Sequence, residues 1–164
     1  MTLLSTSLLS TRLPAAVHHV ALTVTDLDTS RAWYQRLLGA APVVDEDVPG
    51  LPGHHKGFHH TIFMLSGGVV LALHGHEAVE PDHRFDELRP GLDHVGLACA
   101  DRGELERLRD RLDELGIRHG GIATDELGHA LSFRDPDGIA LEFWAPRSSS
   151  DGTGGTDGTE GVAS

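Results

Sequence analysis

The same phrase occurs twice in this chain: residues 17–33 read VHHVALTVTDLDTSRAW, and residues 92–108 read LDHVGLACADRGELERL. Each copy starts with a histidine, alternates apolar with small or polar residues, and reaches an aspartate seven residues later, as in His19 to Asp26 and His94 to Asp101. The alternation predicts a β-strand, and an aspartate before a helical pattern predicts a helix N-cap. A repeat of this kind indicates two similar structural modules.

The residues that follow each repeat predict further strands. In the first half, a helix should end at Gly39, and a Pro-, Gly- and His-rich loop at 48–57 should lead into strands at 58–65 and 68–74. In the second half, a helix should end at Gly116, and a closing hairpin should follow at 129–144. We therefore expect each half to contain a strand, a helix and then two or three strands.

Neither half could cover its apolar sheet face alone, so we expect the halves to lie side by side in one α+β domain. Helices should cover the convex side of a curved mixed sheet and leave the concave side as a cleft. We expect a flexible leader at 1–16, a single domain at 17–146 and a disordered Gly/Ser/Thr tail at 147–164. Module one should span 17–75, the linker 76–91 and module two 92–146.

The bulk composition excludes several classes of function. The 164-residue chain carries a formal net charge of −12, which argues against nucleic acid and anionic membrane surfaces as partners. No apolar run approaches the roughly 20 residues of a transmembrane helix. The single cysteine, Cys99, rules out an internal disulfide framework and favours a reducing, cytoplasmic location, with Cys99 itself a buried and inert thiol.

Three side chains are candidate metal ligands. His19 and His94 occupy the same position in the two repeats, and Glu142 interrupts the apolar strand GIALEFW, where a carboxylate is costly unless something pairs with it. Two imidazoles and one carboxylate are the donors of open, catalytic divalent-metal sites. The alternatives are an outward-facing Glu142 on an edge strand and half-buried histidines at the strand starts.

Three segments together resemble the vicinal oxygen chelate superfamily, the group of glyoxalases, bleomycin-resistance proteins and extradiol dioxygenases. They are HHVALTVTDLDTSRAWYQRLLGA at 18–40, GLDHVGLACAD at 91–101 and LSFRDPDGIALEFW at 131–144, and the resemblance covers residues 17–146. It implies paired βαβββ modules around a cleft in which a metal ion chelates two adjacent oxygens of a small-molecule substrate. Single-domain members commonly pair, so the resemblance also implies a homodimer.

The resemblance implies the same three ligands one position at a time: His19 opens the first strand, His94 opens the second module, and Glu142 lies in the last strand. The family's remaining ligand position falls on Ala72, because Gly68 aligns with Gly138. Glyoxalase-like members have Glu or Gln there. The departure argues against glyoxalase I and epimerase chemistry and leaves the three-ligand pattern of extradiol dioxygenases and fosfomycin enzymes.

Other histidines are candidates for further roles. His74 follows Ala72 by two residues on the same strand face, and is a candidate fourth ligand, a catalytic general acid or base, or a polar strand end. Two histidines at corresponding positions of the halves are candidates for supporting the ligands: His59 and His129. Three more belong either to a solvated loop or to a lid over the metal: His54, His55 and His60.

These residues favour a metal-dependent enzyme that binds one divalent ion and a small oxygenated substrate. Fe(II) is favoured, and Mn(II), Zn(II) and Ni(II) are also compatible with the donors. Three protein ligands with an open fourth position favour a dioxygenase-like oxidoreductase, in which His74 and Glu142 take part in catalysis. The alternatives are a lyase, isomerase or thiol transferase of the same superfamily, or a metal-free drug-binding resistance protein.

Overall fold

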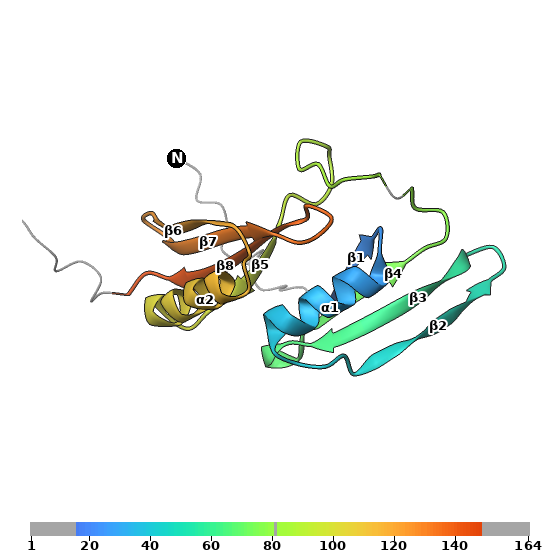
Figure 1. Ribbon diagram of the computed structural model, residues 1–164, viewed down its shortest axis with the longest axis horizontal. Helices are drawn as coiled ribbons and strands as arrows, with labels where there is room; N and C mark the ends of the chain where they lie inside the picture. The colour runs from blue at the N-terminus through green and yellow to red at the C-terminus, as the bar shows by residue number, and fades with distance from the viewer. Residues whose placement is uncertain (1–15, 81, 149–164) are drawn as a thin grey trace, which may run out of the picture.

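The computed structural model describes residues 16–80 and 82–148, so the predicted leader and most of the predicted tail lie outside the described residues. Module one contains five main elements: β1 (His19–Val24), α1 (Leu27–Leu38), β2 (Val44–Leu51), β3 (His55–Met64) and β4 (Val70–Gly75). Module two repeats them: β5 (Val95–Ala98), α2 (Arg102–Glu114), β6 (His119–Thr124), β7 (Gly128–Arg134) and β8 (Ala140–Pro146). The predicted α+β fold of two βαβββ modules is confirmed (Figure 1).

Each module forms its own four-stranded mixed sheet. The strand order is β1-β4-β3-β2 in sheet A of module one and β5-β8-β7-β6 in sheet B of module two. The first strand of each module pairs in parallel with the last, and the other pairs are antiparallel. The eight strands are thus divided into two sheets that share one topology.

Both predicted helix N-caps are confirmed, because each aspartate side chain accepts a hydrogen bond from a backbone N–H of the first helical turn. Asp26 accepts the backbone N–H of Thr29 at 3.0 Å, and Asp101 accepts that of Glu104 at 2.8 Å. These bonds satisfy N–H groups that have no partner inside the helix. Gly39 ends α1 with a φ of 64°, a left-handed conformation that favours glycine.

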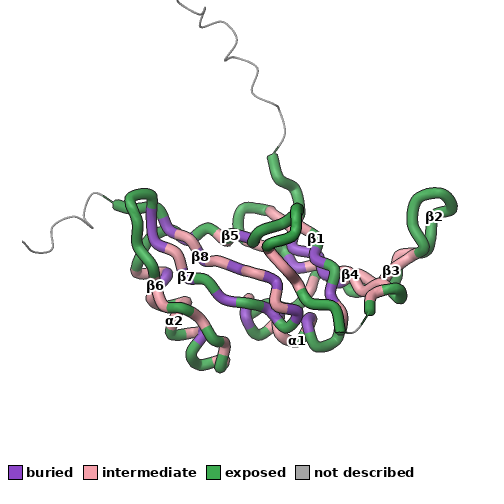
Figure 2. The backbone as a smooth tube through the Cα atoms, turned by 90° about the horizontal axis from the view of Figure 1, so that it is seen from above, coloured by how far each residue is buried: buried purple, intermediate pink, exposed green. Residues whose placement is uncertain are grey.

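The core lies between the helices and one face of each sheet. Along β8, buried residues alternate with partly exposed ones, as expected for a strand covered on one face (Figure 2). Leu73, Leu105 and Leu131 are fully buried, and the predicted burial of Cys99 is confirmed. Among the described residues, no helix covers the opposite face of either sheet, and the candidate ligands project from that face.

Module one packs on module two through α1. Trp33 lies against Phe133 with the ring centroids 6.4 Å apart, and the Tyr34 hydroxyl donates to Asp135 at 3.1 Å. The backbone N–H of Thr25, just before α1, donates to Asp137 at 3.1 Å. The turn between β7 and β8 therefore clasps α1 and the residue just before it, and this contact joins the two modules.

The loop predicted at 48–57 is wrong, because these residues form the end of a β-hairpin in which only residues 52–54 are a turn. Strand β2 pairs only with β3, and the chain turns at residues 52–54 before β3 begins at His55. Pro49 is tolerated because β2 is an edge strand, where a missing N–H breaks no inner ladder. The hairpin extends beyond β4 at the far end of the molecule (Figure 1).

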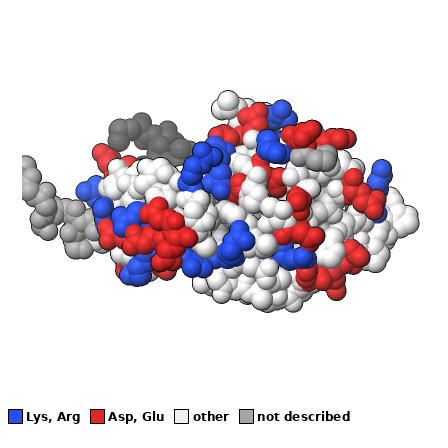
Figure 3. Space-filling model, in the orientation of Figure 1, with Lys and Arg blue, Asp and Glu red and all other residues white. Residues whose placement is uncertain are grey.

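Neither described helix is long and apolar enough to cross a membrane. On the face drawn in Figure 3, basic and acidic side chains are interspersed, and the basic ones do not gather into a continuous patch. This distribution agrees with the net charge of −12 and gives no surface suited to a polyanion on that face.

Candidate functional site

Strand β8 places Glu142 on the open face of sheet B. Gly96 pairs with Glu142 across the parallel β5–β8 ladder, and His94 precedes Gly96 by two residues, so all three belong to one face. Ser132 pairs with Glu142 from β7, and its hydroxyl donates to Glu142 Oε2 at 3.3 Å. The neighbouring Leu141 points the other way and is buried beneath α2.

His94 is held in an orientation suited to a metal ligand. Its Nδ1 lies 2.7 Å from Oδ1 of Asp93, and its side chain is about half exposed. A carboxylate at Nδ1 favours the tautomer with the proton on that nitrogen, which leaves the lone pair on Nε2. Histidine ligands of protein metal sites are commonly supported by such a carboxylate.

His94 and Glu142 line one open cavity of about 1020 Å³ at the end of sheet B. Trp33 of α1 forms part of its wall, and Arg118 and Arg134 supply positive charge. Arg134 also pairs with Glu87 of the linker and thereby lowers the pKa of that carboxyl. The cavity thus combines two candidate metal ligands, apolar walls and cations.

The other candidate residues lie on the open face of sheet A. His19 leads β1, and the parallel register places Ala21 beside Ala72 and Thr23 beside His74. Ala72 and His74 therefore share the face of His19, as the sequence predicts. Ala72 is only 4% exposed, and its strand partners are Ala21 of β1 and Ile62 of β3.

His74 lies among other aromatic and imidazole rings on this face. Burial lowers its pKa below 6.5, and the nearby imidazoles of His76, His60 and His19 lower it further. The ring of Phe58 lies 4.4 Å from that of His74, centroid to centroid, and accounts for part of this burial. A neutral imidazole can accept a proton, as a general base requires.

One chain does not assemble the complete ligand set. His94 and Glu142 share a cavity, and His19 lies near His74, but His19 is absent from the cavity lining. Within residues 16–80 and 82–148, no three His, Cys, Asp or Glu side chains are grouped closely enough to hold a metal ion. The three-ligand site of His19, His94 and Glu142 therefore stays a prediction for the single chain.

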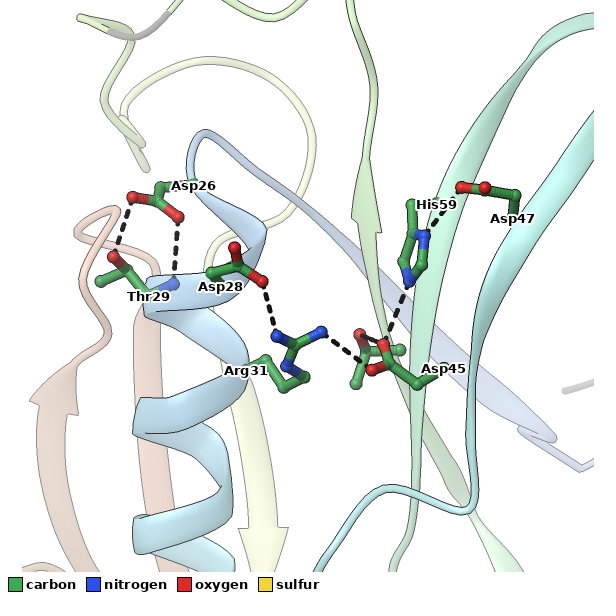
Figure 4. Close-up of polar contacts among 8 residues, drawn as sticks. Asp26, Asp28, Thr29, Arg31, Asp45, Asp47 and His59 are labelled. Atoms are coloured by element: carbon green, nitrogen blue, oxygen red, sulfur yellow. Dashed lines mark hydrogen bonds and ion pairs between the residues drawn. The ribbon is translucent and has the colours of Figure 1, made fainter.

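The two histidines predicted to support the ligands lie on the wrong faces. His129 is buried on the helix-covered face of sheet B, where Nδ1 lies 2.8 Å from the Thr124 hydroxyl. His59 lies on the helix side of sheet A, where it contacts Asp45 and Asp47 (Figure 4). The two histidines do occupy corresponding positions in the two modules, but both side chains point away from the open faces.

The other three histidines do not belong to a loop or a lid as a group. His54 lies in the β2–β3 turn, and His55 begins β3 at the exposed end of the hairpin. His60 lies in the middle of β3, paired with His74 of β4. Only His54 therefore keeps the loop position predicted for it.

The sequence interpretation missed two polar residues that contact the candidate ligands. Asp93 directly precedes His94, so its position next to a candidate ligand could have identified it. Ser132 is ten residues away from Glu142 in the sequence. Only the β7–β8 register brings them together, and no local sequence pattern encodes that register.

Comparison with known proteins agrees with this architecture. A solved glyoxylase/bleomycin resistance protein/dioxygenase domain from Frankia sp. EAN1pec superposes with a TM-score of 0.70 at 34% identity, covering 82% of this chain and 94% of that one. The uncharacterized protein YwkD of Bacillus subtilis is 30% identical over 79% of this chain and 95% of its own length. Metallothiol transferase FosB of Lysinibacillus sphaericus is 26% identical over 78% and 80%, respectively.

The family model of this group matches residues 16–143, which include both repeats and all the candidate ligands. The chain therefore belongs to the Glyoxalase/Bleomycin resistance protein/Dioxygenase superfamily.

Proposed function

We propose that this protein is a divalent-metal-dependent enzyme whose metal is held by His19, His94 and Glu142. The observation that carries the proposal is the pairing of His94 and Glu142 on one cavity wall, each oriented by a neighbouring side chain. Asp93 favours a free lone pair on Nε2 of His94, and Ser132 orients the carboxylate of Glu142. Such supporting contacts are typical of metal ligands.

The third ligand comes, in this proposal, from a second copy of the chain. His19 lies on sheet A, apart from the cavity of His94 and Glu142. Both sheets have an open face and edge strands, which a partner could cover. In a twofold dimer, sheet A of one copy would face sheet B of the other, and two equivalent sites would form.

The donor set fits a divalent ion with open coordination positions. Two imidazoles and one carboxylate favour Fe(II), and Mn(II), Zn(II) and Ni(II) are compatible. A bound ion would supply Lewis-acid polarisation of two adjacent substrate oxygens. The methyl group of Ala72 donates no ligand atom, so a position stays free for substrate or water.

The chain's own residues supply the remaining chemistry. The lowered pKa of His74 favours a ring that can accept a proton from substrate, and Trp33 gives the cavity an apolar wall. Arg118 lines the same cavity and can bind a polar group of the substrate beside the carboxylates of Asp93 and Glu142. We favour a dioxygenase-like oxidoreductase, because three protein ligands leave room for both substrate and dioxygen.

A second candidate is a thiol transferase of the same superfamily. The likeness to a metallothiol transferase favours it, and that reaction uses the same open metal positions without dioxygen. A lyase or isomerase remains an alternative within the enzyme class. A metal-free drug-binding protein would have no use for three ligand-type side chains, so we place it last.

Metal analysis of the full chain tests the proposal directly. Protein purified without added metal should contain at least one divalent ion per chain, and His94→Ala or Glu142→Ala should each remove about one ion per chain. His83→Ala, which changes an exposed linker histidine, is the matched control. Equal metal content in all four proteins would overturn the site, and oxygen uptake with catechol-type substrates separates dioxygenase from non-redox chemistry.

A further inference from the structure

A row of ligand-type side chains crosses sheet A next to the proposed catalytic site. The strand registers pair Glu46 of β2 with His60 of β3, and His60 with His74 of β4. Residues paired directly across neighbouring strands project from the same face of a sheet. Two imidazoles and one carboxylate therefore lie side by side, and neither Glu46 nor His60 has a role in the proposed function.

Within the described residues, one ring nitrogen of His60 is buried without the hydrogen bond that would normally accompany burial. The Nε2 atom is buried and has no hydrogen-bond partner in the part of the chain that the structure describes, although buried ring nitrogens are normally satisfied. The nearest carboxylate atom, Oε1 of Glu46, is 3.7 Å away, which is too far for a hydrogen bond. Two ligand atoms on one metal ion, each bonded at about 2.0–2.2 Å, lie roughly 3–3.6 Å apart. The observed separation is close to that spacing.

The third donor, His74, would have to move toward His60. The ring centroids of His60 and His74 are 6.2 Å apart, whereas two imidazoles on one tetrahedral ion have centroids roughly 5–5.5 Å apart. In the present rotamers no three donors converge within the described residues, so an ion would draw His74 inward by about 1 Å. Glu46 can follow, because its side chain is 69% exposed.

We propose that Glu46, His60 and His74 bind a transition-metal ion of the zinc class, at a site distinct from that of His19, His94 and Glu142. Imidazole and carboxylate donors suit Zn(II) and Co(II), and the open face leaves a fourth position for water. The ion would bridge β2, β3 and β4. It would also occupy the lone pair of His74, so excess metal would inhibit a reaction that uses His74 as a base.

Titration with Co(II) tests this site without any substrate. The parent is the full chain carrying His94→Ala and Glu142→Ala, which removes two ligands of the catalytic site. It should still bind one Co(II), seen as the visible absorption bands of a four-coordinate ion. Adding Glu46→Gln or His60→Gln should weaken Co(II) binding at least about tenfold. Glu77→Gln, an exposed carboxylate outside the row, is the matched control and should change nothing.

The outcomes separate this proposal from the proposed function. Co(II) binding by the parent that is unchanged by Glu46→Gln and His60→Gln would overturn the second site, as would a parent that binds no Co(II). Wild-type protein that binds a single ion, sensitive to His60→Gln but not to His94→Ala, would support the second site and overturn the catalytic one. Because Glu46 is exposed, Glu46→Gln tests the site without disturbing the fold.

Discussion

Asp135 is buried where the two modules meet, and both of its oxygens accept hydrogen bonds. Oδ1 accepts the backbone N–H groups of Asp137 and Ile139 at 2.9 and 2.8 Å, and Oδ2 accepts the Tyr34 hydroxyl at 3.1 Å. Burial nevertheless dominates and raises its pKa from 3.8 to about 6. The folded protein therefore binds a proton at Asp135 more tightly than the unfolded chain does.

Replacing Asp135 with Asn should remove a pH-dependent loss of folding stability. Because the pKa of this acid is raised from 3.8 to about 6 on folding, its contribution to stability falls as the pH rises through that window. The difference amounts to about 2–3 kcal/mol at neutral pH. The stability of Asp135→Asn relative to wild type, measured by urea unfolding, should thus increase from pH 4.5 to pH 7. A variant that is equally destabilised at both pH values would contradict this.

Among the elements, the edge strand β2 is fastened by an ion-pair network centred on His59 (Figure 4). Nδ1 of His59 lies 2.8 Å from Asp47, and Nε2 lies 3.1 Å from Asp45. Arg31 of α1 also binds Asp45, at 2.8 Å, and the Thr61 hydroxyl donates to the same carboxylate at 2.6 Å. A neutral imidazole has only one N–H, so both contacts of His59 are hydrogen bonds only when the ring is protonated.

The attachment of β2 should weaken with rising pH. Hydrogen bonds to Asp47 and then Asp45 raise the pKa of His59 above 6.5 in the folded state. The stabilisation is therefore complete below pH 6.5 and is lost as the pH rises through the folded-state value. The stability advantage of wild type over His59→Gln should be larger at pH 6 than at pH 8.5, by thermal unfolding. His83→Gln serves as the control, and a pH-independent difference would refute the mechanism.

The sequence predicted the repeated elements well because they carry strong local signals. The aspartate N-caps, the alternation of β1 and the leucine stripe of α2 are all encoded within one element. Strand β2 was missed because VDEDVPGL is charged, contains Pro49 and has no alternating apolar face. Such a strand exists only because β3 lies beside it, which no local pattern reveals.

The candidate site was predictable only in part for a similar reason. The repeat and the interrupted apolar strand identified His94 and Glu142, which do share a cavity. Symmetry alone could not show that His19 lies on a different sheet, because the relative placement of the modules depends on the packing of α1 against the β7–β8 turn. The row of Glu46, His60 and His74 depends on register across three strands.

At the scale of the whole molecule, the separation of the open sheet faces leads to a prediction about assembly. His19→Ala and His94→Ala should each abolish metal binding at the catalytic site when purified alone. If the site forms between copies, subunit exchange should regenerate one intact site in every mixed dimer. Random exchange of equal amounts should then restore about one quarter of the wild-type catalytic-site metal, since half of the dimers are mixed and each has one intact site of two.

The measurement is metal content after dialysis, before and after mixing, in the Glu46→Gln background so that the second site does not contribute. Mixing His94→Ala with Glu142→Ala is the matched control, because both changes affect the same module and no intact site can form. Restoration in the control mixture, or none in the test mixture, would rule out a site shared between two copies. Sedimentation of the wild-type protein as a 17.6 kDa monomer would rule it out as well.

The clasp between α1 and the β7–β8 turn also has a consequence for synthesis on the ribosome. Sheet A can close once residue 75 has emerged, because β1 and β4 then both exist. Trp33 and Tyr34 of α1, however, can contact Phe133 and Asp135 only when nearly the whole chain has been translated. During that interval Trp33 is exposed on the incomplete nascent chain. We therefore expect α1 to be a binding site for a ribosome-associated chaperone.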